Sequence, residues 1–185
     1  MGELKERLDN LRVLIQKSEF LEGKGLSNEV NIRIFCYAPA DEMLVRHFVE
    51  QIVTDQSMNC HLIEYNLYHV FLSICEDRRI IKAIPALEEK KGKEFIRDQL
   101  SRMANNTAFV NKMKYEPHEA GDVILITGVG DAFPFIRVHD LLNAMQPEFP
   151  DVPILVFYPG NYDGRDVQLF QCLKKNPYYR AFNVI

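Results

Sequence analysis

The chain has 185 residues, of which 47% are hydrophobic and 26% are charged. This length is typical of one domain, and the composition excludes a largely disordered chain because it supplies enough apolar surface for a core. The formal net charge is −4, which does not favour direct binding to nucleic acid, since such binding depends on Lys and Arg neutralising phosphates.

Helix and strand patterns alternate in the N-terminal half. Leu4, Leu8 and Leu11 recur at helical spacing, and this periodicity predicts an amphipathic helix. Pro39 follows a short apolar run and is typical of a helix start, while Asn66 can cap a helix through its side chain. In chain order, we predict a helix over residues 4–15, a strand over 31–37, a helix over 44–52, a strand over 61–65 and a helix over 66–78.

Two continuous apolar runs dominate the C-terminal third. Residues 122–127 (DVILIT) and 153–158 (PILVFY) are typical of strands that are covered on both faces, and we expect Pro159 and Gly160 to end the second run. The other predicted elements are a helix over 80–103 with breaks near Pro85 and Gly92, a short helix around 109–113, a helix over 135–145, a short helix around 167–173 and an edge strand over 179–185.

This alternation of strands and helices predicts an α/β fold. We expect a single three-layer domain over residues 1–185, in which a mostly parallel sheet of about five strands carries helices on both faces. Within it, residues 1–28 would form the amphipathic helix and a linker, and residues 29–185 would form the sheet-containing body. The connections between parallel strands should cross in the right-handed sense.

Ligands of open α/β sheets usually bind beyond the carboxyl ends of the strands. Gly128 and Gly130 follow a predicted strand and could approach a phosphate, but the third glycine and the lysine of known phosphate loops are missing. A tight strand-to-helix turn is the other interpretation. Asp41, Asp131 and Asp163 could converge on Mg²⁺, and each is equally explained as a cap or turn residue. We therefore assign no metal ligand.

Aromatic and arginine side chains near the predicted strand ends are candidates for protein contacts, because Tyr and Arg are favoured at interfaces. On a regular helix, Arg137 and His139 would project to different sides and could not serve one ligand. Core packing of an edge strand also explains part of the aromatic tail. The interaction candidates are Arg137, Tyr162, Arg165, Tyr178, Tyr179 and Arg180.

Several functional classes lack their usual signatures. The four cysteines show no C-x-x-C spacing and are interpreted as small core residues. We find no serine-nucleophile elbow and no zinc-binding histidine pair, so we assign no catalytic residue and no cofactor. Residues 1–18 lack the apolar segment of a signal peptide, and no apolar run is long enough to span a membrane. We therefore expect a cytoplasmic protein.

Three segments of the C-terminal third carry a resemblance to a known family. They are residues 128–143, which contain GVG and FPFIRVHDLLN, residues 152–164 (VPILVFYPGNYDG), and residues 169–182, which contain LF and NPYYRAF. In order and spacing they resemble the BrxB family of bacteriophage-exclusion (BREX) defence systems.

The resemblance implies a non-catalytic component of an anti-phage system. It implies binding to a PglZ-type, alkaline-phosphatase-like protein, together with other BREX components. The alternative is a nucleotide- or phosphate-binding α/β enzyme or regulatory subunit that uses the glycine turns at the strand ends. A DNA-contacting module is the third hypothesis, and the acidic balance of the chain disfavours it. The oligomeric state is left open.

Overall fold

The computed structural model describes residues 2–23, 31–177 and 182–183. Within these residues, a parallel sheet has the strand order β2-β3-β4-β1-β7. These strands are β1 (Ile32–Tyr37), β2 (His61–Asn66), β3 (Asp122–Thr127), β4 (Ile154–Tyr162) and β7 (Phe182–Asn183). Two further strands, β5 (Asp166–Leu169) and β6 (Asn176–Pro177), continue from β4 in antiparallel pairing.

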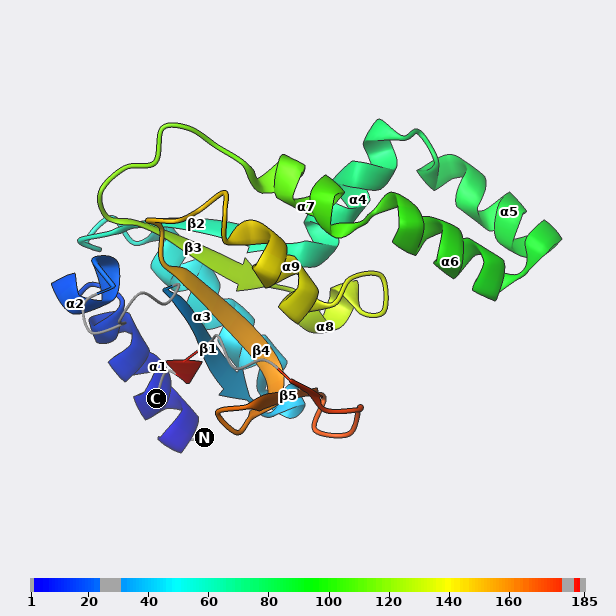
Figure 1. Ribbon diagram of the computed structural model, residues 1–185. Helices are drawn as coiled ribbons and strands as arrows, with labels where there is room; N and C mark the ends of the chain where they lie inside the picture. Colours follow the sequence, from blue (N-terminus) through cyan, green and yellow to red (C-terminus); the bar gives the residue numbers. More distant parts are fainter. Residues whose placement is uncertain (1, 24–30, 178–181, 184–185) are drawn as a thin grey trace.

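Helices cover both faces of this sheet (Figure 1), which confirms the predicted α/β class. One face packs against α1 (Gly2–Leu14), α2 (Ser18–Leu21) and α3 (Glu42–Thr54). The other carries α4 (Leu67–Asp77), α7 (Asn106–Met113), α8 (Val129–Ala132) and α9 (Val138–Met145), while α6 (Lys93–Met103) adds Ile96 and Leu100 to the same apolar core. The 3-10 turns η1 (Pro39–Asp41) and η2 (Ile81–Ala83) and the helix α5 (Ile84–Lys91) complete the described helical elements.

The strands divide the apolar residues between two cores. In β3, Ile124 and Ile126 face the core under α4 and α9, while Val123 and Leu125 face the core under α1 and α3. All six residues of β3 are buried, because a parallel strand with helices on both faces has no solvated side. The same reason explains why its sequence is a continuous apolar run rather than an alternating one.

Two predictions around β4 are wrong. The strand does not end at Pro159 and Gly160 but continues to Tyr162, and residues 166–169 form the strand β5 instead of a helix. Gly160 permits this pairing, because a Cβ at this position would lie 2.1 Å from the backbone carbonyl oxygen of Gln168. Pro159 is tolerated because it lies at the end of the parallel ladder with β1, where a missing N–H costs little.

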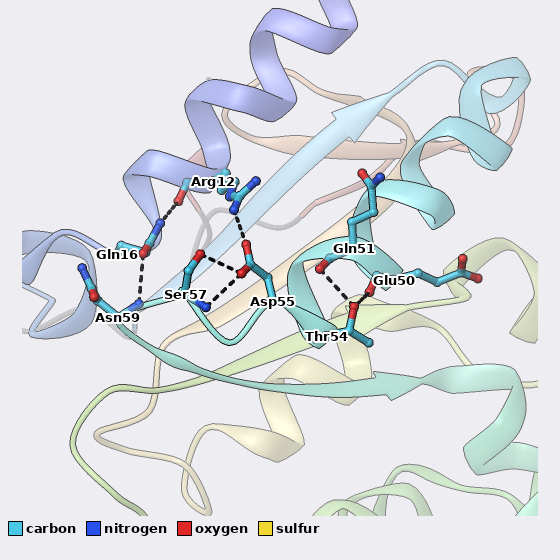
Figure 2. Close-up of polar contacts among 8 residues, drawn as sticks. All are labelled: Arg12, Gln16, Glu50, Gln51, Thr54, Asp55, Ser57 and Asn59. Carbon is cyan, nitrogen blue, oxygen red and sulfur yellow. Dashed lines mark hydrogen bonds and ion pairs between the residues drawn. The ribbon is translucent and has the colours of Figure 1, made fainter.

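Polar contacts at the amino edge of the sheet fasten α1 to the turn after α3 (Figure 2). Arg12 forms an ion pair with Asp55, and the backbone N–H of Asn59 donates to Gln16 Oε1 over 3.0 Å. Asp55 also accepts from the backbone N–H of Ser57 over 2.9 Å. These contacts are structural, and they leave the carboxyl edge of the sheet as the side to search for a site.

Two further features of the fold concern its helices. The helical hairpin of α5 and α6 projects away from the sheet (Figure 1), and Gly92, with a φ of +86°, separates its two helices. This break agrees with the one predicted from the sequence. In the described part of the chain, no helix has the length and apolar character needed to cross a membrane.

Candidate functional site at the carboxyl edge of the sheet

A cleft of about 570 Å³ opens at the carboxyl ends of the parallel strands. Tyr37 ends β1, Asn66 ends β2 and Thr127 ends β3, and all three line the cleft. The helix that follows β1 covers one face of the sheet, and the helices that follow β2 and β3 cover the other. The chain therefore diverges at this edge, which is where open α/β sheets usually bind ligands.

A hydrogen-bonded network links the two walls of the cleft. The Tyr37 hydroxyl donates to Glu42 Oε2 over 2.6 Å, and Arg46 Nε donates to Glu42 Oε1 over 2.7 Å. Arg46 also forms an ion pair with Asp131 of α8. Burial raises the pKa of Tyr37, and its hydrogen bond to Glu42 raises it further. The phenol therefore stays protonated at neutral pH and acts as a hydrogen-bond donor.

A second polar contact joins β2 to β3 at the cleft. Thr127 Oγ1 donates to Glu64 Oε1 over 2.6 Å. Asn66 Oδ1 accepts from the backbone N–H groups of Tyr68 and His69 over 3.1 and 3.2 Å, which confirms the predicted cap of α4. The Asn66 side chain therefore satisfies two backbone donors that the start of a helix leaves unpaired.

Gly128 has a structural reason to be glycine. Its φ is +65°, in the left-handed region, and a Cβ would lie 2.5 Å from Asn66 Oδ1. The missing side chain thus lets the turn after β3 pack against the α4 cap. Gly130 is similarly restricted, because its Cβ would lie 2.8 Å from Phe170 Cε1. Both observations favour the tight-turn interpretation of these glycines over the phosphate interpretation.

The charge of the cleft is predominantly negative. Four carboxylates face one arginine and one histidine among its lining residues; the carboxylates belong to Glu42, Glu50, Glu64 and Asp131. Phosphate binding relies on cationic side chains and free backbone N–H groups. This balance of charge opposes a phosphate ligand.

The structure separates the three predicted aspartates. Asp131 lines the cleft, and Asp41 lies in η1, outside the lining. Asp163 lies in the turn between β4 and β5, where Lys175 Nζ donates to it over 2.9 Å. Within the described residues, no group of three His, Cys, Asp or Glu side chains is arranged to hold a metal ion.

Arg137 and His139 come together, contrary to the prediction that they project to different sides. The regular helix begins only at Val138, and Arg137 has extended backbone with φ −108° and ψ 120°. Both residues therefore line a second, smaller pocket. The helical prediction was wrong here because it began the helix at residue 135.

The other interaction candidates lie in the C-terminal segment. Tyr162 ends β4, and its hydroxyl donates to the Gly164 carbonyl oxygen over 3.1 Å. The backbone N–H of Arg165 donates to Asp163 Oδ1 over 3.1 Å. Tyr178, Tyr179 and Arg180 lie outside the described residues, so their interface role stays a prediction.

The sequence analysis missed the network of Tyr37, Glu42 and Arg46. One signal was available, because Glu42 and Arg46 are four residues apart in a predicted helix, a spacing that permits an ion pair. The contacts with Tyr37 and Asp131 depend on tertiary structure. Asp131 is 85 residues from Arg46 along the chain.

Fold and cleft together define an α/β protein with an open parallel sheet and a polar carboxyl edge. The sequence profile of the family described as "BREX protein BrxB" matches residues 63–184. The chain belongs to this family, which confirms the resemblance found in its sequence, and it is a component of a BREX system.

Two relatives match along nearly their whole length. "BREX protein BrxB" of Bacillus cereus (strain H3081.97) is 37% identical over 192 residues, covering 100% of this chain and 99% of that protein. "BREX protein BrxB" of Escherichia coli O9:H4 (strain HS) is 27% identical over 183 residues, covering 98% and 92%. No solved structure matches the chain.

Proposed function

We propose that this chain is a non-catalytic BREX component that binds a PglZ-type, alkaline-phosphatase-like partner in the cytoplasm and supports assembly. The observation that carries the proposal is the pairing within the cleft. Glu42 accepts hydrogen bonds from Tyr37 and Arg46, and Arg46 also pairs with Asp131. These contacts stabilise the cleft itself, and this structural use of the side chains supports a non-catalytic role.

Exposed apolar side chains support a docking role. Met43 and Leu44 at the start of α3 are 73% and 44% exposed, and Tyr68 at the start of α4 is 37% exposed. They belong to the two helices that border the cleft. Exposed apolar and aromatic side chains are favoured at protein contacts.

Capture of the partner tests this proposal. The full-length chain, carrying an affinity tag, is co-expressed with the PglZ-type protein of its own BREX system, and the eluate is analysed by size-exclusion chromatography. We expect one stable complex. The PglZ-type protein of an unrelated BREX system serves as the specificity control. Two monodisperse proteins that elute separately at micromolar concentration would contradict the proposal.

The position and size of the cleft favour one alternative, a nucleotide or phosphate ligand, because the cleft lies where α/β sheets bind such groups. Thermal unfolding with ATP, GTP or inorganic phosphate, each with and without Mg²⁺, tests it. A ligand at roughly 100 times its Kd stabilises the native state by about 2.7 kcal/mol. We expect no such increase, because the carboxylates of the cleft repel phosphate.

A further inference from the structure

A second pocket, of about 200 Å³, lies beside the cleft on the α4 and α9 face of the sheet. We call it the socket. Its walls come from α8, α9, β4 and β5 and from the segment after β5. Four of its aliphatic side chains are less than 9% exposed: Val129 at 5%, Ile136 at 7%, Val138 at 6% and Leu169 at 8%.

The size and lining of the socket suit one large apolar side chain. Pockets for whole small molecules are usually larger, about 300 Å³ or more. Phe133 also lines the socket and is 36% exposed. Burial lowers the pKa of His139, and the nearby Arg137 lowers it as well, against the effect of Asp140. The imidazole is therefore mainly neutral at pH 7 and compatible with an apolar guest.

Tyr158 supplies a hydroxyl that has no hydrogen-bond partner among the described residues. Its side chain lines the socket and the residue is only 3% exposed, yet its hydroxyl makes no hydrogen bond to any residue in the described part of the chain. Burial raises the pKa of Tyr158, so the hydroxyl remains a donor, and an incoming acceptor would satisfy it.

Two cationic side chains, those of Arg137 and Lys174, line the exposed part of the socket. Arg137 and Lys174 are exposed lining residues, and neither has an ion-pair partner among residues 2–23, 31–177 and 182–183. The neighbouring Lys175 differs, because it pairs with Asp163. Among the described residues, no carboxylate lines the socket itself, although Asp140 Oδ1 lies 3.5 Å from His139 Nε2 on its border.

The backbone around Lys174 is held in place. Gln168 Nε2 donates to the Leu173 carbonyl oxygen over 3.0 Å, and Asn176 Nδ2 donates to the Lys174 carbonyl oxygen over 3.0 Å. These bonds fix the segment that carries Lys174 against β5. The Lys174 side chain therefore extends from an ordered backbone segment, which reduces the entropy cost of binding.

We propose that the socket takes one large apolar side chain from an acidic segment of a protein partner, with Arg137 and Lys174 contacting the flanking carboxylates. The Tyr158 hydroxyl then donates a hydrogen bond to a backbone carbonyl oxygen of that segment. The inference rests on the proposed function in one respect, because the partner segment is assigned to the protein that this chain binds. The chemistry of the socket does not depend on that assignment.

Peptide titration tests the socket by itself. The ¹⁵N-labelled full-length chain is titrated with a blocked pentapeptide in which Phe is flanked by two Asp on each side. We expect shifts of the amide signals of Val129, Val138 and Leu173. Two control peptides replace Phe by Ala or all four Asp by Lys, and each should bind about tenfold more weakly, because each removes either the buried apolar surface or the charge pairing.

Three results would contradict the proposal that the socket binds an apolar side chain of an acidic segment. The first is an absence of shifts at these residues at millimolar peptide. The second is equal binding of the Ala peptide, which would show that no apolar side chain enters. The third is an equal set of shifts with inorganic phosphate, which would show a simple anion site.

Capture of the PglZ-type protein then connects the socket to the partner. The double variant Arg137→Glu, Lys174→Glu reverses the exposed charges, and Leu173→Trp fills the half-buried edge of the socket. Each should reduce capture at least tenfold, whereas Lys5→Glu on the exposed side of α1 should not. Circular dichroism verifies that every variant folds.

The outcomes distinguish the two proposals. If the unmodified chain captures the partner and both socket variants capture it equally well, the socket assignment is wrong while the proposed function stands. If the unmodified chain captures nothing but the acidic Phe peptide binds at the socket, the proposed partner is wrong and the socket stands.

Discussion

The cleft and the socket lie on either side of the turn after β3 and differ in almost every property. The cleft is large and charged, and its lining arginine, Arg46, pairs with Glu42 and Asp131. The socket is small and apolar, and its two cations lack ion-pair partners among the described residues. Volume alone would favour the cleft.

This contrast shows that groups without partners, rather than empty volume, indicate where a ligand would gain the most binding energy. A ligand in the cleft must replace interactions that the protein already makes, so much of its binding energy is offset. A guest in the socket buries new apolar surface and meets a hydroxyl and two cations that have no partner among the described residues. Preorganised, unpaired groups favour association because little has to be broken first.

The largest expected loss of stability comes from the turn after β3, where Gly128 lines the cleft. Gly128→Ala places a Cβ 2.5 Å from Asn66 Oδ1 in left-handed backbone, and strain together with a weakened α4 cap should lower the free energy of unfolding by about 2–3 kcal/mol. Urea unfolding measures it. Gly164→Ala, also at positive φ but in open space, is the matched control and should lose about 1 kcal/mol. Equal losses would show that the contact with Asn66 is unimportant.

A hydrogen-bonded network around Asp122, at the amino edge of the sheet and opposite the cleft, provides a further comparison. Asp122 is 3% exposed and accepts from the Tyr115 hydroxyl over 2.8 Å and the Glu119 N–H over 2.9 Å, with His61 Nδ1 2.9 Å away. Asp122→Asn should therefore cost about 1–3 kcal/mol of stability at pH 7. Urea unfolding at neutral pH measures this loss.

The pH dependence of the same variant has a defined sign. Burial acts to raise the pKa of Asp122, but the hydrogen bonds from Glu119, His61 and Tyr115 hold it below its usual value. The stabilisation is thus complete above the unfolded pKa, about 3.9, and is lost as pH falls through the lower folded pKa. The gap between wild type and Asp122→Asn should narrow in that acidic range. A gap that stays constant to pH 2 would contradict this assignment.

The stability effects of replacing one arginine in the cleft and one at the socket can be compared directly. Arg46→Ala removes ion pairs that are 40% exposed on the arginine side, so it should cost about 0.5–1 kcal/mol after solvent screening. Arg137→Ala removes a side chain without an ion-pair partner in the described chain and should change stability by less than about 0.5 kcal/mol. Thermal unfolding measures both. A larger loss for Arg137→Ala would show that this side chain supports the fold.

The smallest expected effect is on the pKa of Asp163. It concerns two adjacent lysines beside the socket, Lys174 and Lys175. Backbone donation from Asp166, the bond from Lys175 and backbone donation from Arg165 lower the pKa of Asp163 to about 2. Lys175→Ala should raise this pKa in a carboxylate NMR titration, whereas Lys174→Ala should leave it unchanged. A rise with Lys174→Ala would place that charge in the turn rather than at the socket.

Local sequence predicted most elements because their causes are local. The apolar run of β3 and the cap at Asn66 each act within a few residues, and both were located to the residue. The pairing of β5 with β4 escaped prediction, because the reason for Gly160 is a carbonyl group of Gln168 on the neighbouring strand. Arg137 was misplaced because a start of α9 at residue 135 was assumed instead of one at Val138.

The sequence by itself determined the α/β class, the family and the order of the main helices and strands, since periodicity, caps and motif strings are written along the chain. The pairing of Arg46 with Glu42 and Asp131 inside the cleft was visible only in the tertiary structure. So was the placement of Arg137, Lys174 and Tyr158 around one apolar pocket. The physical reason is that side-chain pairing and burial depend on distances between residues far apart in sequence, and no local pattern encodes those distances.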